Sequence, residues 1–272
     1  MDFTIITASY NYGHYVAECM ESVASQEGVT FEHLVMDAGS TDDTPEVVAK
    51  FQHASFFQEP DKGMSDGINK GFLKAKGKWV MWLNADDRML PGALKAVKGH
   101  AETHHNADVI YGCWNFIDTN GKHQRTMTLF PFVRSMLPNH YCYIASTSTY
   151  FRRETTIEEG FLLDIDFRVV MDGEYYCRLA YAGKKFSYLP RILADFRLHD
   201  QSISQRNLGK NDMAGILAYQ RQVAESRAIR RMYGIKLFKD EMANSIVDGL
   251  LFHGYRVLKG VLKVIYRGKT IK

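Results

Sequence analysis

Short apolar runs alternate with helix-like segments through the first half of the chain. The apolar runs lie at residues 3–7, 31–36, 56–57, 79–83 and 109–111. Helical spacing or helix-start residues fall between them, at residues 16–26, 44–45 and 91–94. Because strands that alternate with helices form parallel sheets through crossover connections, the sequence predicts an α/β fold with a Rossmann-like, mostly parallel central sheet flanked by helices.

The pattern changes in the second half. Residues 118–121 form a turn signal, and the aromatic-rich stretches at residues 147–151 and 185–189 predict shorter, mixed strands. After His199 the periodicity becomes helical and the strand signals stop. We therefore predict one α/β domain over residues 1–205 and a helical C-terminal extension over residues 206–272.

Polar residues follow three of the predicted strands at the point where each strand ends. These loops lie at residues 9–11, 37–42 and 84–87. Ligands of open α/β sheets bind beyond the carboxyl ends of the strands, so we expect the three loops to share one ligand-binding edge. Such residues are also ordinary in turns and helix caps, and capping is the leading alternative for Asp42.

Two adjacent carboxylates, Asp86 and Asp87, follow the apolar run at residues 79–83. They repel each other, and a hard divalent cation bound through oxygen ligands offsets that repulsion. Such a cation would also bridge a diphosphate. The pair therefore predicts a divalent-cation site at the ligand-binding edge.

A segment between the third and fourth apolar runs, residues 59–71, is rich in glycine and hydrogen-bonding side chains. Its second half has helical character, so that Asp66, Asn69 and Lys70, three and four positions apart, lie near one another on one helix face. This face is a candidate ligand contact. The alternative is a solvated helix surface, which is usual for charged residues.

Composition narrows the class of protein. The 272 residues carry a formal net charge of +3, which is too mild to predict a nucleic-acid partner. The four cysteines are far apart, so neither a paired-cysteine metal motif nor a disulfide framework is predicted, and the cytoplasm is the simplest location. Because a strand-like run begins at Phe3, we expect no signal peptide, and we expect no membrane-spanning helix.

Six motifs in order resemble those of family 2 glycosyltransferases, the large inverting group with the GT-A fold. Residues 7–11 resemble the opening strand-to-loop motif, and residues 37–42 resemble the Asp-Gly-Gly-Ser-Thr-Asp segment. Residues 59–71 are similar to the run Glu-Pro-Asp-Lys-Gly-x-x-Asp-x-x-Asn-Lys-Gly, found in a subset often associated with bacterial surface polysaccharides. The other three matches are the Asp-x-Asp position at residues 84–86, the base-bearing motif at residues 171–175 and the late histidine motif at residues 198–204.

The resemblance implies a GT-A fold and a metal-dependent, inverting transfer of a sugar from a UDP- or GDP-linked donor to an acceptor hydroxyl. It implies a role in polysaccharide or lipopolysaccharide-type glycan synthesis, with donor binding at about residues 1–112 and acceptor binding at about residues 113–205. It assigns Asp86 and His199 to a Mn²⁺ or Mg²⁺ ion on the donor diphosphate. A histidine in isolation is more often structural, but imidazole suits Mn²⁺.

The resemblance also places a general base within residues 171–175, where Gly173 replaces a larger, often aromatic residue of the family. The base is either Asp172 or Glu174. We favour Asp172, because it matches the family's catalytic aspartate and a carboxylate within hydrogen-bond reach of a hydroxyl suits the task. The alternative for Asp172 is a helix cap or an ion-pair partner.

The expected donor contacts follow from the same resemblance. Asp37 is expected at the edge of the nucleotide base, and the ring of Tyr10 is expected to pack against that base. Asn84 replaces the first aspartate of the Asp-x-Asp motif and is expected to meet the ribose or a water, while Asp87 is a turn residue or orients its neighbour. The other expected donor-binding residues are Thr7, Ser9, Asn11, Gly63, Asp66, Asn69, Lys70, Ala85 and Asp86.

Other functions fit the pattern less well. A sugar nucleotidyltransferase needs a glycine-rich phosphate loop after the first strand, and a dehydrogenase needs Gly-x-Gly-x-x-Gly at that turn; residues 10–14 contain neither. A non-catalytic nucleotide-sugar-binding module would keep the fold but lose the metal and base carboxylates, and both are present.

Apolar and basic residues recur at helical spacing near the C-terminus. The apolar set is Ile246, Leu250, Val257, Val261 and Ile265, and the basic set is Arg256, Lys259, Lys263 and Arg267. Such an amphipathic helix predicts contact with a membrane interface, which suits a peripheral enzyme at the inner face of the cell membrane with a lipid-linked acceptor. A helix packed on its own domain or in a homo-oligomer fits the pattern equally well.

Overall fold

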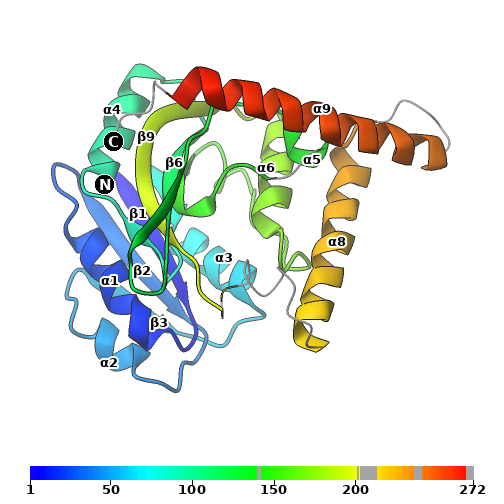
Figure 1. Ribbon diagram of the computed structural model, residues 1–272. Coiled ribbons are helices and arrows are strands. Elements are labelled where there is room, and N and C mark those ends of the chain that lie inside the picture. Colours follow the sequence, from blue (N-terminus) through cyan, green and yellow to red (C-terminus); the bar gives the residue numbers. More distant parts are fainter. Residues whose placement is uncertain (140–141, 201, 203–212, 236–240, 268–272) are drawn as a thin grey trace.

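The chain folds around a single sheet in a computed structural model that describes residues 1–139, 142–200, 202, 213–235 and 241–267 (Figure 1). The described strands have the order β3-β2-β1-β4-β8-β6-β9-β5, and β7 pairs with β6 off this path. Their bounds are β1 (Phe3–Ser9), β2 (Phe31–Asp37), β3 (Ala54–Gln58), β4 (Trp79–Trp82), β5 (Arg88–Met89), β6 (Val109–Ile117), β7 (His123–Met127), β8 (Thr149–Arg152) and β9 (Phe186–Arg197). The predicted α/β architecture is confirmed.

The first four strands form a parallel half-sheet. β1 pairs in parallel with β2 and with β4, and β2 pairs in parallel with β3. In this register Ser9 lies opposite Asp37, so the carboxyl ends of β1 and β2 meet at one edge, as the polar loops predicted. Beyond β4 the sheet is mixed: β8 is antiparallel to β4 and β6, while β9 is parallel to β6.

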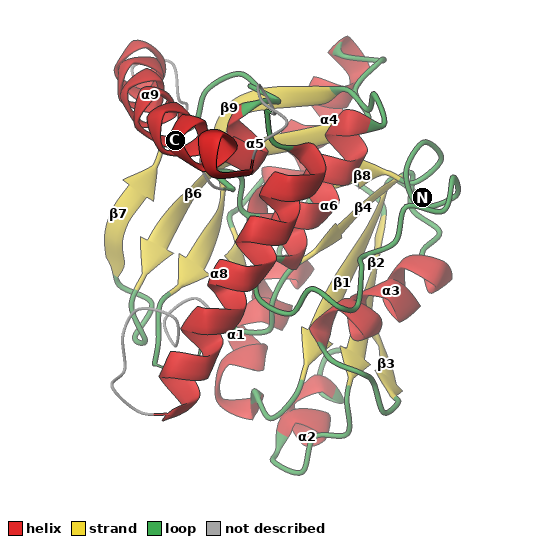
Figure 2. Ribbon diagram, turned by 90° about the vertical axis from the view of Figure 1, so that its right-hand side faces the viewer, coloured by secondary structure: helices red, strands yellow, loops and turns green. Residues whose placement is uncertain are grey.

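Helices cover both faces of the parallel half-sheet (Figures 1 and 2). Ile5 of β1 packs in a core cluster with residues of α1 and α4, and Ile6 packs in a second cluster with residues of α3 and α6. Because both faces are buried, the strands are apolar at consecutive positions. The helices are α1 (Gly13–Ala24), α2 (Thr44–Val48), α3 (Met64–Lys74), α4 (Ala93–Thr103), α5 (Met136–Asn139), α6 (Met171–Tyr181), α8 (Met213–Tyr233) and α9 (Glu241–Arg267), with a short 3₁₀ helix, η1 (Ser146–Ser148).

The two C-terminal helices pack on the α/β domain. Ile229 of α8 is 6% exposed and belongs to the core cluster that contains α6. α9 crosses one end of the sheet (Figure 1), where Leu262 and Tyr266 pack against that core and the ring of Tyr266 meets Tyr188 of β9 edge-on. In the described part of the chain, the predicted helical C-terminal extension consists of α8 and α9.

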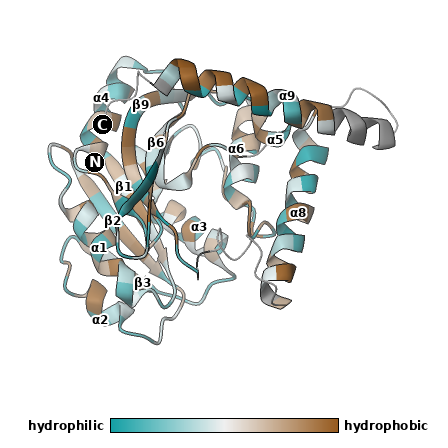
Figure 3. Cartoon of the chain, viewed as in Figure 1, coloured by the Kyte–Doolittle hydropathy of each residue, from teal (hydrophilic) through white to brown (hydrophobic). Residues whose placement is uncertain are grey.

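Many residues of α9 are apolar (Figure 3), and several of these are exposed on its outer face. Its exposed side chains include Leu250, Val257, Val261 and Ile265, all from the predicted apolar set. Of the basic set, Lys259 is only 7% exposed, and Lys263 is half-buried with Nζ 3.9 Å from the sulfur of Met127. These two lysines face the domain, whereas Arg256 is exposed.

Some predictions fall on parts of the chain that the structure does not describe. The side chains of Ile246 and Arg267 lie outside the described residues. Residues 201 and 203–205, which belong to the predicted histidine motif and the predicted domain boundary, also lie outside them. Within the described ranges, no helix is long and apolar enough to cross a membrane.

Candidate active site

Asp37 ends β2 and organises the turn that follows. Its Oδ1 accepts hydrogen bonds from the N–H groups of Gly39 at 2.9 Å and Ser40 at 2.7 Å, and its Oδ2 accepts one from the Ser40 hydroxyl at 2.5 Å. Gly39 has a positive φ of 99°, a conformation that glycine adopts without strain. The turn holds the buried carboxylate in a fixed orientation at the ligand-binding edge.

Asn11 joins the loop after β1 to this turn. Its Oδ1 accepts from the N–H of Thr41 at 2.9 Å, and its own N–H donates to the hydroxyl of Ser40 at 2.8 Å. Its φ of 58° lies in the left-handed region, which asparagine tolerates better than most residues. The preceding residue, Tyr10, is 57% exposed, so most of its side chain is accessible to a ligand at this edge.

Thr7 and Ser9 both have buried side chains on β1, with different surroundings. The Thr7 hydroxyl shares a 2.9 Å hydrogen bond with Nε2 of His33, and burial lowers the pKa of His33 to about 3. Thr7 is therefore held by a neutral imidazole from β2. The Ser9 hydroxyl, by contrast, is buried without a hydrogen-bond partner among the described residues, which leaves it available to a ligand.

Asp86 and His199 lie side by side although 113 residues separate them in the sequence. Nε2 of His199 is 2.7 Å from Oδ2 of Asp86, and the two residues are 6% and 8% exposed. The rings of Tyr12 and Tyr15 from the start of α1 lie 6.0 Å and 5.0 Å from the imidazole. The fold thus brings together the two residues that were predicted to share a metal ion.

Asp87 holds the acidic loop in place through two hydrogen bonds. Its Oδ1 accepts from the N–H of Arg197 at 2.9 Å, and its Oδ2 accepts from the amide of Asn84 at 3.0 Å. Burial and the neighbouring Asp86 raise the pKa of Asp87 well above its usual range. The other amide atom of Asn84, Oδ1, is buried without a partner among the described residues, while Ala85 packs in a core cluster with Val16 of α1.

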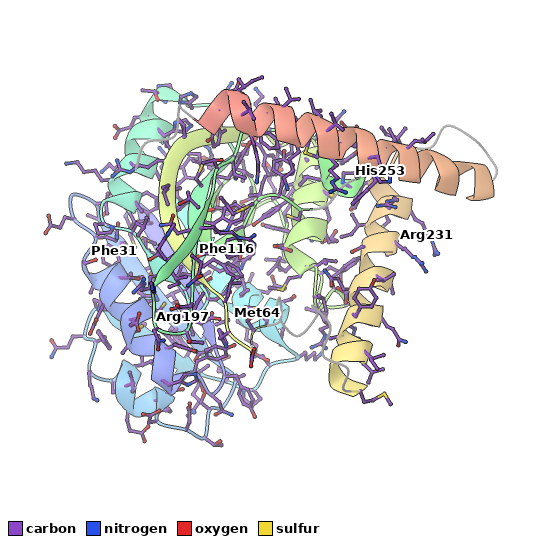
Figure 4. All side chains as sticks on the ribbon, in the orientation of Figure 1. Phe31, Met64, Phe116, Arg197, Arg231 and His253 are labelled. Atoms are coloured by element: carbon purple, nitrogen blue, oxygen red, sulfur yellow. The ribbon has the colours of Figure 1, made fainter. Side chains whose placement is uncertain are left out.

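Arg197, which the sequence analysis missed, ties the acidic loop to α1 and to the β6–β7 turn. Figure 4 labels its position. It is fully buried at the end of β9, and its Nε donates to the carbonyl of Asp86 at 2.8 Å. Nη2 donates to Glu18 of α1 at 2.6 Å, and Nη1 donates to the carbonyl of Thr119 in the β6–β7 turn at 3.0 Å. One guanidinium therefore sets the position of the loop that carries Asp86. Its position two residues before His199 was the one feature of the sequence that could have indicated a role at this site.

The segment from Glu59 to Gly71 consists of a short loop, which its own side chains close, and the first part of α3, which begins at Met64. Asp66 accepts from the N–H of Lys62 at 2.9 Å, and Lys70 donates to the carbonyl of Pro60 at 2.6 Å. Gly63 has a φ of 117°, and a Cβ there would stand 2.1 Å from a guanidinium nitrogen of Arg168. Asp66 and Lys70 share one face, with Nζ 3.9 Å from a carboxylate oxygen, as their spacing predicted.

Asn69 and Ser65 connect α3 to the chain that leads into α6. The amide of Asn69 exchanges two hydrogen bonds with the backbone of Leu163, both 2.8 Å long. The hydroxyl of Ser65 lies 2.9 Å from the sulfur of Met171 and 3.2 Å from the carbonyl of Phe167. These contacts bring the start of α3 close to the start of α6, which carries Asp172.

Asp172 and Glu174 differ in their surroundings on α6. Asp172 is half-buried, its Oδ1 accepts from the N–H of Gly173 at 2.7 Å, and burial raises its pKa to about 6. Glu174 is 3% exposed and forms a two-point ion pair with Arg178, at 2.9 Å and 3.0 Å. Asp172 therefore has the pKa of a base that works near neutrality, whereas Glu174 is engaged in an ion pair.

The residues at the edge suit a metal ion that the substrate helps to hold. No group of three or more metal-ligating side chains occurs in the described ranges. Asp86 and His199 supply one carboxylate and one imidazole, a donor set that fits Mn²⁺, and such ions are commonly completed by phosphate oxygens and water. The unpartnered oxygens of Ser9 and Asn84 lie at the ends of the neighbouring strands.

The fold resembles the solved structures of two proteins in complex with nucleotide sugars. TarS residues 1–349 from S. aureus, in complex with UDP-GlcNAc, matches with a TM-score of 0.62 at 17% identity, over 86% of this chain and 74% of that chain. The mannosyltransferase PcManGT from Pyrobaculum calidifontis, in complex with GDP-Man and Mn²⁺, matches with a TM-score of 0.55 at 15% identity, over 98% and 86%. The sheet with its flanking helices is thus GT-A-like, as predicted.

Sequence comparison identifies the family. An uncharacterised glycosyltransferase from Nostoc is 28% identical over 92% of this chain and 76% of its own length. A PGL/p-HBAD biosynthesis glycosyltransferase from Mycobacterium bovis is 30% identical over 40% of this chain and 45% of its own length. The model of glycosyl transferase family 2 matches residues 4–160. The chain belongs to this family and is a nucleotide-sugar-dependent glycosyltransferase.

Proposed function

We propose that this enzyme transfers a sugar, with inversion, from a UDP- or GDP-linked donor to a hydroxyl of a glycan acceptor. The contact between Asp86 and His199 carries the proposal, because it joins the acidic loop and the late histidine motif at the ligand-binding edge. The complexes of TarS with UDP-GlcNAc and of PcManGT with GDP-Man and Mn²⁺ support a donor of this class.

The donor nucleotide is proposed to lie over the ends of β1 and β2. Tyr10 offers an exposed ring for the base, and the fixed carboxylate of Asp37 accepts from a base N–H. The unpartnered oxygens of Ser9 and Asn84 would accept hydrogen bonds from the ribose or from water. Asp66 and Lys70 are proposed to contact the ribose and phosphates of the donor. The other residues that the motifs predicted are also proposed as donor contacts.

Asp86 and His199 are proposed to hold Mn²⁺ or Mg²⁺ on the donor diphosphate. When bound, such an ion neutralises the charge that develops on the leaving nucleoside diphosphate. Arg197 keeps the backbone of Asp86 in place through its 2.8 Å hydrogen bond, so the carboxylate need not reorganise when a donor arrives.

Asp172 is proposed as the general base. It takes the proton of the acceptor hydroxyl while that oxygen forms a bond to the anomeric carbon of the sugar. The bond from this carbon to the diphosphate breaks on the opposite face, and the nucleoside diphosphate leaves with the bonding electrons. No covalent enzyme intermediate is needed, so one carboxylate suffices.

The division of labour along the chain is also a proposal. Residues 1–112 are proposed to bind the donor and residues 113–205 the acceptor, with a surface polysaccharide or a lipid-linked sugar as the acceptor class. Contact with the inner face of a membrane and formation of a homo-oligomer stay predictions, because the exposed apolar face of α9 is compatible with either.

Donor binding tests the proposal directly. Thermal unfolding is measured with a panel of UDP- and GDP-sugars, in Mn²⁺ or in excess chelator. A donor at about one hundred times its Kd should stabilise the folded state by about 2.7 kcal/mol in Mn²⁺ and by much less in chelator. Asp86→Asn should lose the Mn²⁺-dependent part, while the control Asp166→Asn, at an exposed aspartate, should keep it. Stabilisation that is equal in chelator and in Mn²⁺ would remove the metal from the proposal.

A further inference from the structure

Glu225 of α8 binds the backbone that leads into α6. Its Oε1 accepts from the N–H of Arg168 at 2.9 Å, and its Oε2 accepts from the N–H groups of Val169 at 2.9 Å and Val170 at 3.0 Å. The glutamate is 8% exposed although α8 lies at the edge of the molecule. One carboxylate from the C-terminal extension therefore satisfies three consecutive backbone donors.

These three donors lie directly before the proposed base. Val170 is the N-cap of α6, and Asp172 is the second residue of the helix. No side chain of Val170 can cap the helix, and no side-chain hydrogen bond from the N-cap is present. A buried carboxylate that accepts hydrogen bonds from several N–H groups at a helix start forms strong, charge-assisted bonds. Its negative charge also interacts favourably with the positive end of the helix dipole. Glu225 thus fixes the point at which α6 begins.

The rest of α8 follows α6 in the same direction. A Cβ on Gly173 would lie 3.8 Å from Cδ1 of Ile229, one turn beyond Glu225, and 3.4 Å from Cβ of Cys142. One turn later, the hydroxyl of Tyr233 lies 3.5 Å from Glu174. Gly173 leaves room for Ile229 at the place where the resembling family has a larger residue. The small residue at position 173 therefore allows α8 to pack close to the start of α6.

We propose that Glu225 is a positioning residue for Asp172, so that the C-terminal extension forms part of the catalytic unit. The inference rests on the proposed role of Asp172 as general base. The described contacts of Glu225 are with the backbone at residues 168–170 and with Arg221 of its own helix, and not with Asp37 or Asp86. Its effect should therefore fall on the chemical step rather than on donor binding.

Three variants test the proposal. Glu225→Ala removes all three acceptors, Glu225→Gln keeps one neutral acceptor oxygen, and the control Ser226→Ala changes the next, exposed residue of α8. We expect kcat to fall about tenfold to a hundredfold in Glu225→Ala, with KM for the donor and the Kd of the nucleoside diphosphate within twofold of wild type. Glu225→Gln should recover part of kcat, and Ser226→Ala should match the wild type.

Hydrogen–deuterium exchange separates this inference from the proposed function. The amides of residues 168–170 should exchange faster in Glu225→Ala than in Ser226→Ala, whether or not a donor has been found. Unchanged exchange there, or a wild-type kcat in Glu225→Ala, would overturn the positioning role. An equal loss of kcat and donor affinity would also overturn it, because that result indicates a distortion that reaches the donor edge. Failure of the proposed function would appear instead as wild-type protein that turns over none of the donors.

Discussion

At the scale of single residues, the proposed role of Asp172 as general base predicts how the activity depends on pH. Burial raises its pKa to about 6, so the base form prevails only above that pH. We expect kcat/KM to fall about tenfold per pH unit below pH 6, as for a single essential base. A flat profile down to pH 4.5 would show that another group takes the proton.

The same pKa shift has a signature in stability. The folded state binds the proton of Asp172 more tightly than the unfolded state, where the pKa is near 3.8. The contribution of this group is therefore most favourable below about pH 4 and is lost as the pH rises through 6. Asp172→Asn should raise Tm relative to wild type at pH 8 and leave it unchanged at pH 4. The exposed control Asp166→Asn should show no such dependence, and a lower Tm of Asp172→Asn at pH 8 would contradict the assignment.

At the scale of elements, close packing of α3 on β1 holds the 59–71 segment over the sheet. A Cβ on Gly71 would stand 2.6 Å and 3.0 Å from side-chain carbons of Ile6, whereas Gly99 of α4 has nothing within 4 Å. Gly71→Ala should therefore destabilise the fold by about 1–3 kcal/mol through overpacking. Gly99→Ala should stabilise it by about 0.5–1 kcal/mol, because alanine favours a helix. Denaturant unfolding measures both, and equal effects would contradict the close approach at Gly71.

The elements also show how far the sequence could predict the site. The parallel strands and their polar loops were predictable, because apolar runs and turn residues are local signals. The meeting of Asp86 with His199 followed only from the resemblance, since 113 residues separate them. Arg197 and Glu225 were harder to predict, because a charged residue in a strand or helix usually faces solvent. Both are buried with partners on other elements, and only Arg197 had a signal in the sequence, its place near His199. The sequence also did not predict which side of α9 faces the domain, because Lys259 is buried against the domain while apolar residues of the same helix are exposed.

At the scale of the whole molecule, α9 exposes several apolar side chains on its outer face. Figure 4 shows His253 of α9 well apart from Arg197. If a membrane covers this face, the protein should co-sediment with anionic vesicles, and the double variant Val257→Asp, Val261→Asp should bind far less. The two valines are 69% and 51% exposed, so these changes should not disturb the fold. No vesicle binding by the wild type would remove the membrane prediction.

The central claim is that one chain joins a donor edge to a base on α6. Release of nucleoside diphosphate from a panel of UDP- and GDP-sugars, with Mn²⁺ and candidate acceptor glycans, tests it most directly. The account predicts turnover by the wild type with at least one donor, and a loss of at least a hundredfold in Asp172→Asn, which should still bind that donor with wild-type affinity. Equal turnover by Asp172→Asn and wild type would contradict the account.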